Sequence, residues 1–549
     1  MRTTGAVTFI LCALALCSCD GGGGGSSDDG SSGGGSSGGG GSDGGGSSGS
    51  PPSQNEAPRI LNLSADPSTV ASGQASSISW TASHADSCTA SGGWTGSLPT
   101  SGSASTGPLT STTTFTLNCT GIGGSANGST TVSVSPPAAS SVFPLHVEAG
   151  KRYLLDAQGQ PFFLHGDAAW SIMVQLRRGE VDQYLEDRRQ KGFNAILVNL
   201  IEHHFADNAP NNVNGDGPFT TPGDFSTPNE AYFSNAEYVI SRAGERGFLV
   251  LLAPAFMGFE GGDEGWYQEM VENGATRLRA YGQYVANRFR AHGNVLWIEG
   301  GDYDPPETAL ANAVADGIRD VDTPWLQTFQ GRRGTAALEF FDTPPAWLTV
   351  NNIYTTESTV VSAAFQEYSR SASPFFLIEA SYEGEGATAQ VVRAQAYQAI
   401  LSGAVGHVMG NNPVWSFASG WQSALNSPGA VTLTHLRTVV GSIAWWSLQP
   451  DTDGTLLTAG VSSDSTRAAA AVASDGSFAL IYTPESRDLS VDLARLSGPN
   501  VRARWYDPTS GSYQAASDVL PATGTRVLRP GSANAAGDAD WVLVLNSQP

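Results

Sequence analysis

The sequence predicts a multidomain protein in which a (β/α)8 barrel lies between two small β-sandwiches. In residues 143–450, strand-like runs alternate with helical patterns eight times, which is the expected layout of such a barrel. In residues 57–135 and 455–549, short runs with a period of two are separated by turn residues, as in all-β domains. A chain of 549 residues is long enough for three or four domains.

The barrel prediction depends on its strands and on the helices between them. Helical spacing of apolar residues occurs at Val181, Tyr184 and Leu185, and again around residues 236–243 and 278–285. A doubly wound open sheet is the alternative, but no glycine-rich phosphate fingerprint follows the first strand. The expected strands are 161–167, 194–200, 248–254, 294–300, 325–330, 348–354, 374–380 and 404–410.

The flanking segments have the composition of β domains. Residues 57–135 contain the alternating runs "SSISWTAS", "TTTFTLNCTG" and "STTVSVSP", and they resemble bacterial immunoglobulin-like modules, most of which are spacers. Cys88 and Cys119 lie in runs that are expected to face each other across this sandwich and to form one disulfide. Residues 455–549, with "FALIYT", "VRARWYD" and "DWVLVL", predict a second β-sandwich packed on the barrel.

The N-terminus predicts export. Residues 1–19 have an early Arg2, an apolar core and a short polar exit, which is the pattern of a signal peptide. The exit "LCSC" resembles a bacterial lipobox with Cys19 as the lipidated residue and Cys17 as the alternative; an ordinary cleaved signal would instead give a secreted protein. Residues 20–56, which are rich in Gly and Ser, predict a flexible tether. We therefore expect an exported protein held at a bacterial membrane by a lipid anchor only.

Charge and motif content narrow the function classes. A net charge of −23 with 28 Lys and Arg argues against nucleic acid as a partner, although a local cleft can still accept an acidic substrate. His203 and His204 are adjacent, would point apart on a strand, and have no third ligand at a recognisable spacing, so no metal site is expected. The chain has neither a Gly-x-Ser-x-Gly elbow nor a His-Glu-x-x-His motif, and no cofactor is expected.

Two carboxylates follow barrel strands. In "NVLWIEGGDYD" the strand-like run ends at Glu299, two glycines let the backbone turn, and Asp302 is delivered to the barrel mouth. Glu379 ends the seventh strand. Hydrolysis of a glycosidic bond needs two such carboxyl groups facing one another across the bond. The structural alternative is that Asp302 caps the next helix and that Glu379 pairs with an arginine.

From about Pro144 to Pro450 the sequence resembles the apiosidase-like glycoside hydrolases. The matching stretches include "RYLLDAQGQPFFLHGDAAW", "KGFNAILVN", "GGD", "IEASYEG", "LSGAVGHVMGNNPVW" and "LNSPGAVTLTHLRTVVGSIAWWSLQPD". The last segment, with "RWYDPTSG", looks like the small domain named for collagen binding that follows this barrel, and we expect it to support the barrel rather than to bind collagen.

The resemblance implies roles for individual residues. Asp302 matches the general acid/base and Glu379 the nucleophile, so retention of anomeric configuration is expected, with the carboxyls roughly 5 Å apart. Asp302 then needs a raised pKa. Two neighbouring acids are assigned other roles: Glu299 is expected to turn toward a partner in the barrel wall, and Glu383 to hold the sugar or orient Glu379.

Polar and aromatic residues at other strand ends are candidate substrate contacts, because sugars offer hydroxyls to polar groups and C–H faces to rings. These are Asp167, Trp170, Asn199, Tyr354, Tyr382, Glu383, His407, Asn411, Asn412 and Trp415. His165 and Gln330 depart from the family pattern, and the loop of residues 202–225 can reshape the entrance. We expect these departures to affect the sugar specificity and to leave the mechanism unchanged.

Two functions remain at this stage. The first is a retaining glycoside hydrolase that acts on a plant or microbial polysaccharide, with apiose-bearing pectin as the substrate that the family implies. The second is a non-catalytic carbohydrate- or matrix-binding lipoprotein that uses the barrel as a scaffold. The presence of both carboxylates favours the enzyme.

Overall fold

The computed structural model describes residues 56–71, 74–109, 112–135, 142–321, 325–531 and 533–549. The chain divides into two compact units, Met1–Pro137 and Ala138–Pro549. The signal peptide, Cys19 and the Gly/Ser segment lie outside the described residues. Among the residues described, none of the helices has the length and apolar character that crossing a membrane requires.

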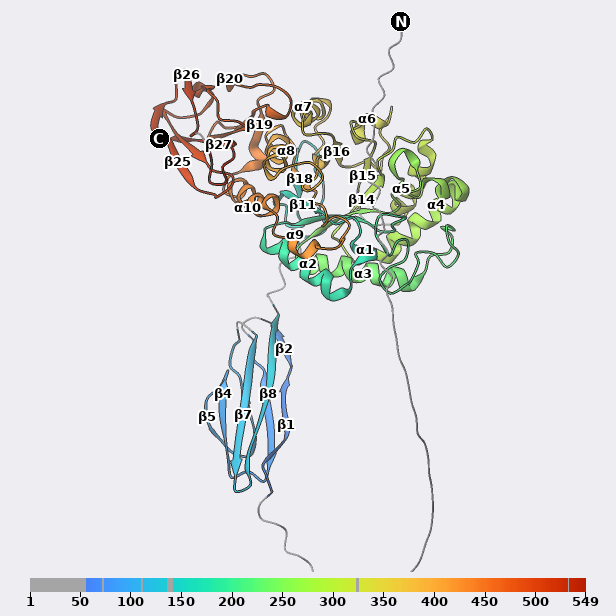
Figure 1. Cartoon of the computed structure of the whole chain (residues 1–549), viewed down its shortest axis with the longest axis vertical. Helices are drawn as coiled ribbons and strands as arrows, with labels where there is room; N and C mark the ends of the chain where they lie inside the picture. Colours follow the sequence, from blue (N-terminus) through green and yellow to red (C-terminus); the bar gives the residue numbers. More distant parts are fainter. Residues whose placement is uncertain (1–55, 72–73, 110–111, 136–141, 322–324, 532) are drawn as a thin grey trace, which may run out of the picture. The chain divides into compact units, whose positions relative to one another are not determined.

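The N-terminal unit consists of two sheets packed face to face (Figure 1). One sheet has the order β1-β3-β6 and the other β2-β8-β7-β4-β5. Alternate side chains of both sheets form one core that includes Ile78, Trp80, Phe115 and Leu117. The strands are β1 (Arg59–Asp66), β2 (Thr69–Ala71), β3 (Ser77–Ser83), β4 (Ser87–Gly92), β5 (Gly96–Leu98), β6 (Ser101–Ser105), β7 (Thr113–Gly121) and β8 (Gly124–Ser135).

The predicted disulfide between Cys88 and Cys119 is confirmed, but its expected position is wrong. The two cysteines are register partners on β4 and β7, which are neighbours in one sheet, so the bond does not cross the sandwich. Alternation alone fixes which face a residue occupies and does not say which strands are paired. The immunoglobulin-like assignment of this unit stays a prediction.

The predicted barrel is confirmed. Its parallel strands form a nearly closed sheet with the order β15-β14-β13-β12-β11-β18-β17-β16. The two ends of this order are joined where the Asn352 side chain donates to the backbone oxygen of Phe329 at 2.8 Å. The strands are β11 (Leu164–Ala168), β12 (Ala195–Asn199), β13 (Leu249–Ala253), β14 (Val295–Gly300), β15 (Leu326–Gln330), β16 (Asn351–Tyr354), β17 (Phe375–Glu379) and β18 (Gly406–Met409).

The burial of its strands explains why the barrel could be predicted from the sequence. Every residue of β12, β13 and β14 is buried, because helices cover the outside of the barrel and side chains fill its interior. A short antiparallel pair, β9 (Leu154–Leu155) and β10 (Pro161–Phe162), precedes the first barrel strand.

The helices surround the barrel (Figure 1). Three of them start where a side chain caps the first turn: Asn229 accepts from Ala231 N, Thr388 from Val391 N, and Ser427 from Ala430 N. The α-helices are α1 (Ile172–Gln175), α2 (Arg178–Gln190), α3 (Glu230–Glu245), α4 (Tyr267–Phe289), α5 (Thr308–Arg319), α6 (Ala337–Phe340), α7 (Val360–Arg370), α8 (Ala389–Leu401), α9 (Trp421–Ala424) and α10 (Pro428–Gly441). Short 3-10 turns are η1 (Phe259–Gly261), η2 (Trp445–Ser447), η3 (Asp464–Thr466) and η4 (Leu493–Arg495).

The C-terminal domain is a second β-sandwich. Its sheets have the orders β19-β21-β22-β27-β24-β25 and β20-β23-β26. The strands are β19 (Leu448–Pro450), β20 (Leu457–Ala459), β21 (Ala469–Ala473), β22 (Phe478–Thr483), β23 (Leu489–Asp492), β24 (Asn500–Tyr506), β25 (Tyr513–Pro521), β26 (Thr525–Leu528) and β27 (Trp541–Gln548).

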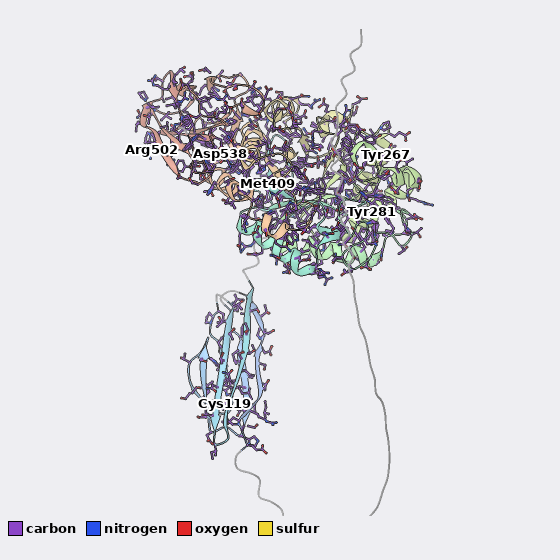
Figure 2. All side chains as sticks on the ribbon, viewed as in Figure 1. Cys119, Tyr267, Tyr281, Met409, Arg502 and Asp538 are labelled. Carbon is purple, nitrogen blue, oxygen red and sulfur yellow. A yellow bond between two sulfur atoms is a disulfide. The ribbon has the colours of Figure 1, made fainter. Side chains whose placement is uncertain are left out.

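This domain packs on the barrel, as predicted. Along β22, Ala479 and Ile481 belong to the core of the sandwich, whereas Leu480 and Tyr482 belong to the core of the barrel. The ring of Tyr482 stacks on that of Tyr397 in α8 at 4.8 Å. The larger sheet is therefore buried on both faces. Beside it, Arg393 of α8 forms an ion pair with Asp538, which Figure 2 labels.

Candidate active site

A cavity of about 300 Å³ opens at the carboxyl ends of the barrel strands. Its walls come from residues at the ends of the eight strands or in the loops that follow them, including the loop after β12. The lining residues are Trp170, Asn199, Phe205, Phe256, Asp302, Arg333, Tyr354, Glu379, Ala380, Ser381, Tyr382, Glu385 and Trp415.

An unusual turn places Asp302 in this cavity. Gly300, Gly301 and Asp302 have φ values of 82°, 121° and 54°, three successive residues in the left-handed region. A β-carbon on Gly301 would lie 2.2 Å from the ring of Phe256, and one on Gly300 would lie 2.5 Å from the Gln330 carbonyl oxygen. Only glycine fits both positions.

The pKa of the Asp302 carboxyl is raised. Burial is the largest cause, and the charge of Glu264 adds to it. A hydrogen bond from Tyr354 and the positive charge of Arg333 act in the opposite direction. Arg333 also donates to the Tyr354 hydroxyl at 3.1 Å, so these residues form one network around the carboxyl.

Glu379 ends β17 and enters the same electrostatic network. Burial and the negative charge of Asp302 raise its pKa to about 7. Hydrogen bonds from Tyr382 and Gln330, and the charge of Arg333, lower it in part. The bond from Gln330 Nε2 to Glu379 Oε2 is 2.7 Å long. Because the charge of one carboxylate changes the pKa of the other, the two groups act as a coupled pair.

Aromatic rings form much of the wall. Trp170 and Phe205 both pack edge-on against Phe256, with centroids 5.6 and 5.7 Å apart, and Phe205 lies 5.7 Å from Trp415. The Trp170 indole N–H donates to the Tyr382 hydroxyl at 3.1 Å. The cavity therefore combines two carboxyl groups with aromatic faces, which is a combination suited to a sugar.

The structure brings part of the predicted contact set to the cavity: Trp170, Asn199, Tyr354, Tyr382 and Trp415 line it together with Asp302 and Glu379. The Asn199 side-chain oxygen is buried and has no hydrogen-bond partner within the described part of the chain. An acceptor is thus available beside the carboxyl pair.

Asp167 and His407 do not line the cavity. Asp167 is fully buried and accepts from Arg188 at 2.6 Å and from Tyr184 at 2.7 Å, both on α2. His407 lies 3.0 Å from His165 through ring nitrogens, and burial lowers its pKa to about 3. Alternate residues of a strand face opposite sides, and Asp167 occupies the side that faces the helices.

Glu383, Asn411 and Asn412 also lie outside the lining. Glu383 accepts from Asn411 at 3.1 Å, from Ser427 at 2.6 Å and from the Gly429 backbone at 2.9 Å, so it fixes the start of α10. Asn412 donates to Glu385 at 2.9 Å. These residues support the loops that form the cavity wall.

Glu299 is buried in the barrel wall, but the partner expected there is missing for its Oε1 among the described residues. It is 2% exposed, and burial alone raises its pKa. His203 contacts Glu269 at 3.1 Å, and within the same residues no cluster of three or more His, Cys, Asp or Glu could hold a metal ion.

Several lining residues were missed from the sequence. Arg333 follows β15 in "GRRG", so the expectation that site residues follow barrel strands could have identified it. Phe256 follows β13 at the same spacing and could have been found in the same way, whereas Phe205 and Glu385 lie further into the loops, where no periodic pattern identifies them.

Comparisons with known proteins agree with this architecture. Residues 148–447 match the family model described as "Apiosidase-like, catalytic domain", and residues 450–546 match the model named for the collagen-binding domain of a collagenase. No curated protein sequence matches the chain significantly.

Solved structures share the fold. One named "Glycoside hydrolase" is 22% identical, with a TM-score of 0.64 over 74% of this chain and 98% of that chain. A glycoside hydrolase family 5 structure from Bacteroides vulgatus ATCC 8482 is also 22% identical, with a TM-score of 0.65 over 75% of this chain and 95% of that chain.

Proposed function

Because the chain belongs to the apiosidase-like catalytic domain family, we propose that it is a retaining glycoside hydrolase that acts on a polysaccharide. The observation that carries the proposal is the pairing of Asp302, which follows β14, with Glu379, which ends β17, in one cavity. Two carboxyl groups that line one cavity and interact electrostatically can supply the acid and the nucleophile that glycoside hydrolysis needs.

In this mechanism Asp302 protonates the leaving glycosidic oxygen while a carboxylate oxygen of Glu379 bonds to the anomeric carbon. Asp302 then takes a proton from water, which attacks the glycosyl-enzyme and frees Glu379. Two inversions at the anomeric carbon give net retention. The active form of the pair holds one proton, which the raised pKa values of both groups support near neutral pH.

The division of roles rests on strand position and on the family motif. Gln330 and Tyr382 hydrogen-bond to Glu379 and favour its ionised form, as a nucleophile requires. Burial and the charge of Asp302 act against that form, and the pKa of Glu379 reaches about 7. The experiment must therefore identify each residue separately.

Apiose-bearing pectin is the substrate we propose, with the aromatic walls contacting the sugar faces. His165 does not alter the cavity directly, since it faces Phe193 at 4.3 Å. Gln330 does, since it bonds to Glu379. We also propose that Cys19 is lipidated and that residues 20–56 tether the enzyme to a bacterial membrane.

The test is product release from plant cell-wall glycans, including apiose-bearing pectin, by the parent chain and by the Glu379→Gln and Asp302→Ala variants. We expect both variants to lose polysaccharide turnover. With an activated aryl glycoside, added azide should rescue Asp302→Ala to a glycosyl azide of retained configuration and Glu379→Ala to one of inverted configuration. Turnover that survives both substitutions would show that the site assignment is wrong. If Asp302→Ala instead gave the inverted azide and Glu379→Ala the retained one, Asp302 would be the nucleophile and Glu379 the acid/base.

A further inference from the structure

A second cavity lies beside the proposed active site and takes no part in the chemistry assigned above. Its volume is about 490 Å³, within the range of small-molecule sites. It lies between the loop that joins β12 to α3 and the first turns of α4. We call it the distal cavity; it is lined by residues 203, 210–211, 217–219, 222–224, 266, 269, 272–273 and 277.

The distal cavity and the catalytic cavity share two segments of wall. In the loop after β12, His203 lines the distal cavity and Phe205 lines the catalytic one. After β13, Phe256 lines the catalytic cavity and Trp266 the distal one, and the Trp266 backbone N–H donates to the Phe256 oxygen at 2.8 Å. Residues two apart in a chain lie within about 7 Å, so only a short stretch of shared wall separates the two cavities at this point.

The lining of the distal cavity combines apolar surface with polar groups that have few partners. Trp266 and Phe219 pack edge-on at 5.7 Å and give it an aromatic wall. The Glu272 carboxylate and the Asn211 amide are exposed, and neither side chain makes a hydrogen bond to another described residue. Hydroxyl groups, which both donate and accept, suit this mixture.

Two residues of the wall, Trp266 and His203, also carry a buried polar atom without a hydrogen-bond partner in the described part of the chain. These atoms are the Trp266 indole N–H and His203 Nδ1. A buried polar group left unpaired costs about 1–3 kcal/mol, so such groups usually have a partner in the working protein.

The charges of the cavity select against an anionic ligand. Its lining carries the carboxylates of Asp224, Glu269 and Glu272, against one arginine, Arg277, which already lies 3.5 Å from Asp224. Because acids outnumber the cation, a neutral sugar fits better than an acidic one.

We infer that the distal cavity binds a second, neutral sugar unit, in a neutral side chain of the polysaccharide whose glycosidic bond is cut beside Asp302 and Glu379. The inference rests on the proposed function and adds to it: the enzyme recognises a glycan that extends at least one unit beyond the cleaved bond, toward the loop of residues 203–224.

The test compares polymer with small substrate in the full chain. The double variant Asn211→Ala, Glu272→Ala removes two exposed side chains that make no hydrogen bond within the described part of the chain. Glu148→Ala, an exposed acid outside both cavities, is the matched control. On apiose-bearing pectin we expect kcat/KM of the double variant to fall about tenfold. On 4-nitrophenyl apioside, which fills only the catalytic cavity, kcat/KM should stay unchanged.

The result that overturns the inference is an unchanged kcat/KM on the polymer, or an equal fall on both substrates, which would indicate a disturbed active site. If neither substrate is cleaved, the proposed function fails, and affinity electrophoresis in the same pectin still decides the inference. There, a retardation of the parent chain that the double variant loses and Glu148→Ala keeps supports a saccharide site; equal migration of all three chains rejects it.

Discussion

Replacing Arg393 with Met tests whether the C-terminal domain and the barrel form one cooperative unit. Arg393 lies on α8 and is 1% exposed. It donates to the two oxygens of Asp540 at 2.8 and 3.1 Å and to Asp538 at 2.6 Å. Met fills much of the same space but removes the charge, which leaves the fully buried Asp540 with Tyr482 and Asn534 as its hydrogen-bond donors.

The size of the effect follows from that remaining environment. Removing one partner of a buried ion pair costs about 3–5 kcal/mol, and the two neutral donors keep the cost near the lower end, about 3 kcal/mol. The unit Ala138–Pro549 has about 410 residues, and at about 2.1 cal/mol/K per residue its entropy of unfolding is about 0.9 kcal/mol/K. The expected fall in Tm is therefore about 3–4 °C.

Scanning calorimetry of the full chain measures this shift. Arg529→Met is the matched control in the same domain, since Arg529 and Asp488 form a pair whose side chains are 59% and 64% exposed. Exposed pairs contribute little, so the control should not move Tm measurably. The reasoning is refuted if Arg393→Met leaves Tm unchanged, or if it creates a separate transition of the C-terminal domain while the barrel melts as before.

Further predictions concern the catalytic cavity. The pKa of Glu379 is about 7 in the folded chain and is taken as its ordinary value of 4.5 in the unfolded chain. The folded chain therefore binds more protons between these values, and its free energy of unfolding falls as the pH rises through that interval. Glu379→Gln should therefore raise Tm near about pH 8 and have no such effect near about pH 4; an equal shift at both values contradicts the raised pKa. Gln330→Leu removes the 2.7 Å bond that favours the Glu379 carboxylate, so the acidic limb of the kcat/KM profile should move to higher pH, and an unmoved limb would count against this coupling. Gly301→Ala places a β-carbon 2.2 Å from the Phe256 ring and should lower kcat about 100-fold by displacing the catalytic turn, whereas Gly150→Ala, at φ 82° in open space, should keep kcat. Equal activity of the two glycine variants would show that the turn tolerates a side chain.

The barrel could be predicted because its strands are buried on both faces. The run at 248–254, for example, contains β13 (Leu249–Ala253), and every residue of that strand is buried. Such strands appear in a sequence as continuous apolar runs between helical patterns. The N-terminal disulfide shows the limit of this reasoning. Having two cysteines in the domain identified the bonded pair, but the pairing of β4 with β7 in one sheet depends on long-range contacts that no local pattern records.

The site could be predicted only in part, and strand geometry explains which part. Tyr354 and Glu379 are the last residues of their strands, at the carboxyl end of the barrel where the cavity lies, and both line the cavity. Asp167 lies one residue before the end of β11 and faces α2, where Arg188, twenty-one positions along the chain, neutralises it. That ion pair is a tertiary contact, which no local sequence pattern reveals. From the sequence alone, Asp167 was therefore as good a candidate for the site as Trp170.

The segment Glu299-Gly-Gly-Asp302 shows how few residues decide which carboxyl group lines the cavity. Glu299 shares a strand face with Trp297, whose ring lies 6.3 Å from Phe289 of α4, so its carboxyl lies on the side of the barrel that faces the helices. Two residues of positive φ then redirect the chain, and Asp302 lines the cavity. The number of carboxyl groups in this segment therefore does not show which of them lines the cavity; the glycines do, because only they permit the turn. It follows that the acid/base function proposed for Asp302 depends on Gly300 and Gly301 as much as on Asp302 itself, although neither glycine has a group that could take part in the reaction.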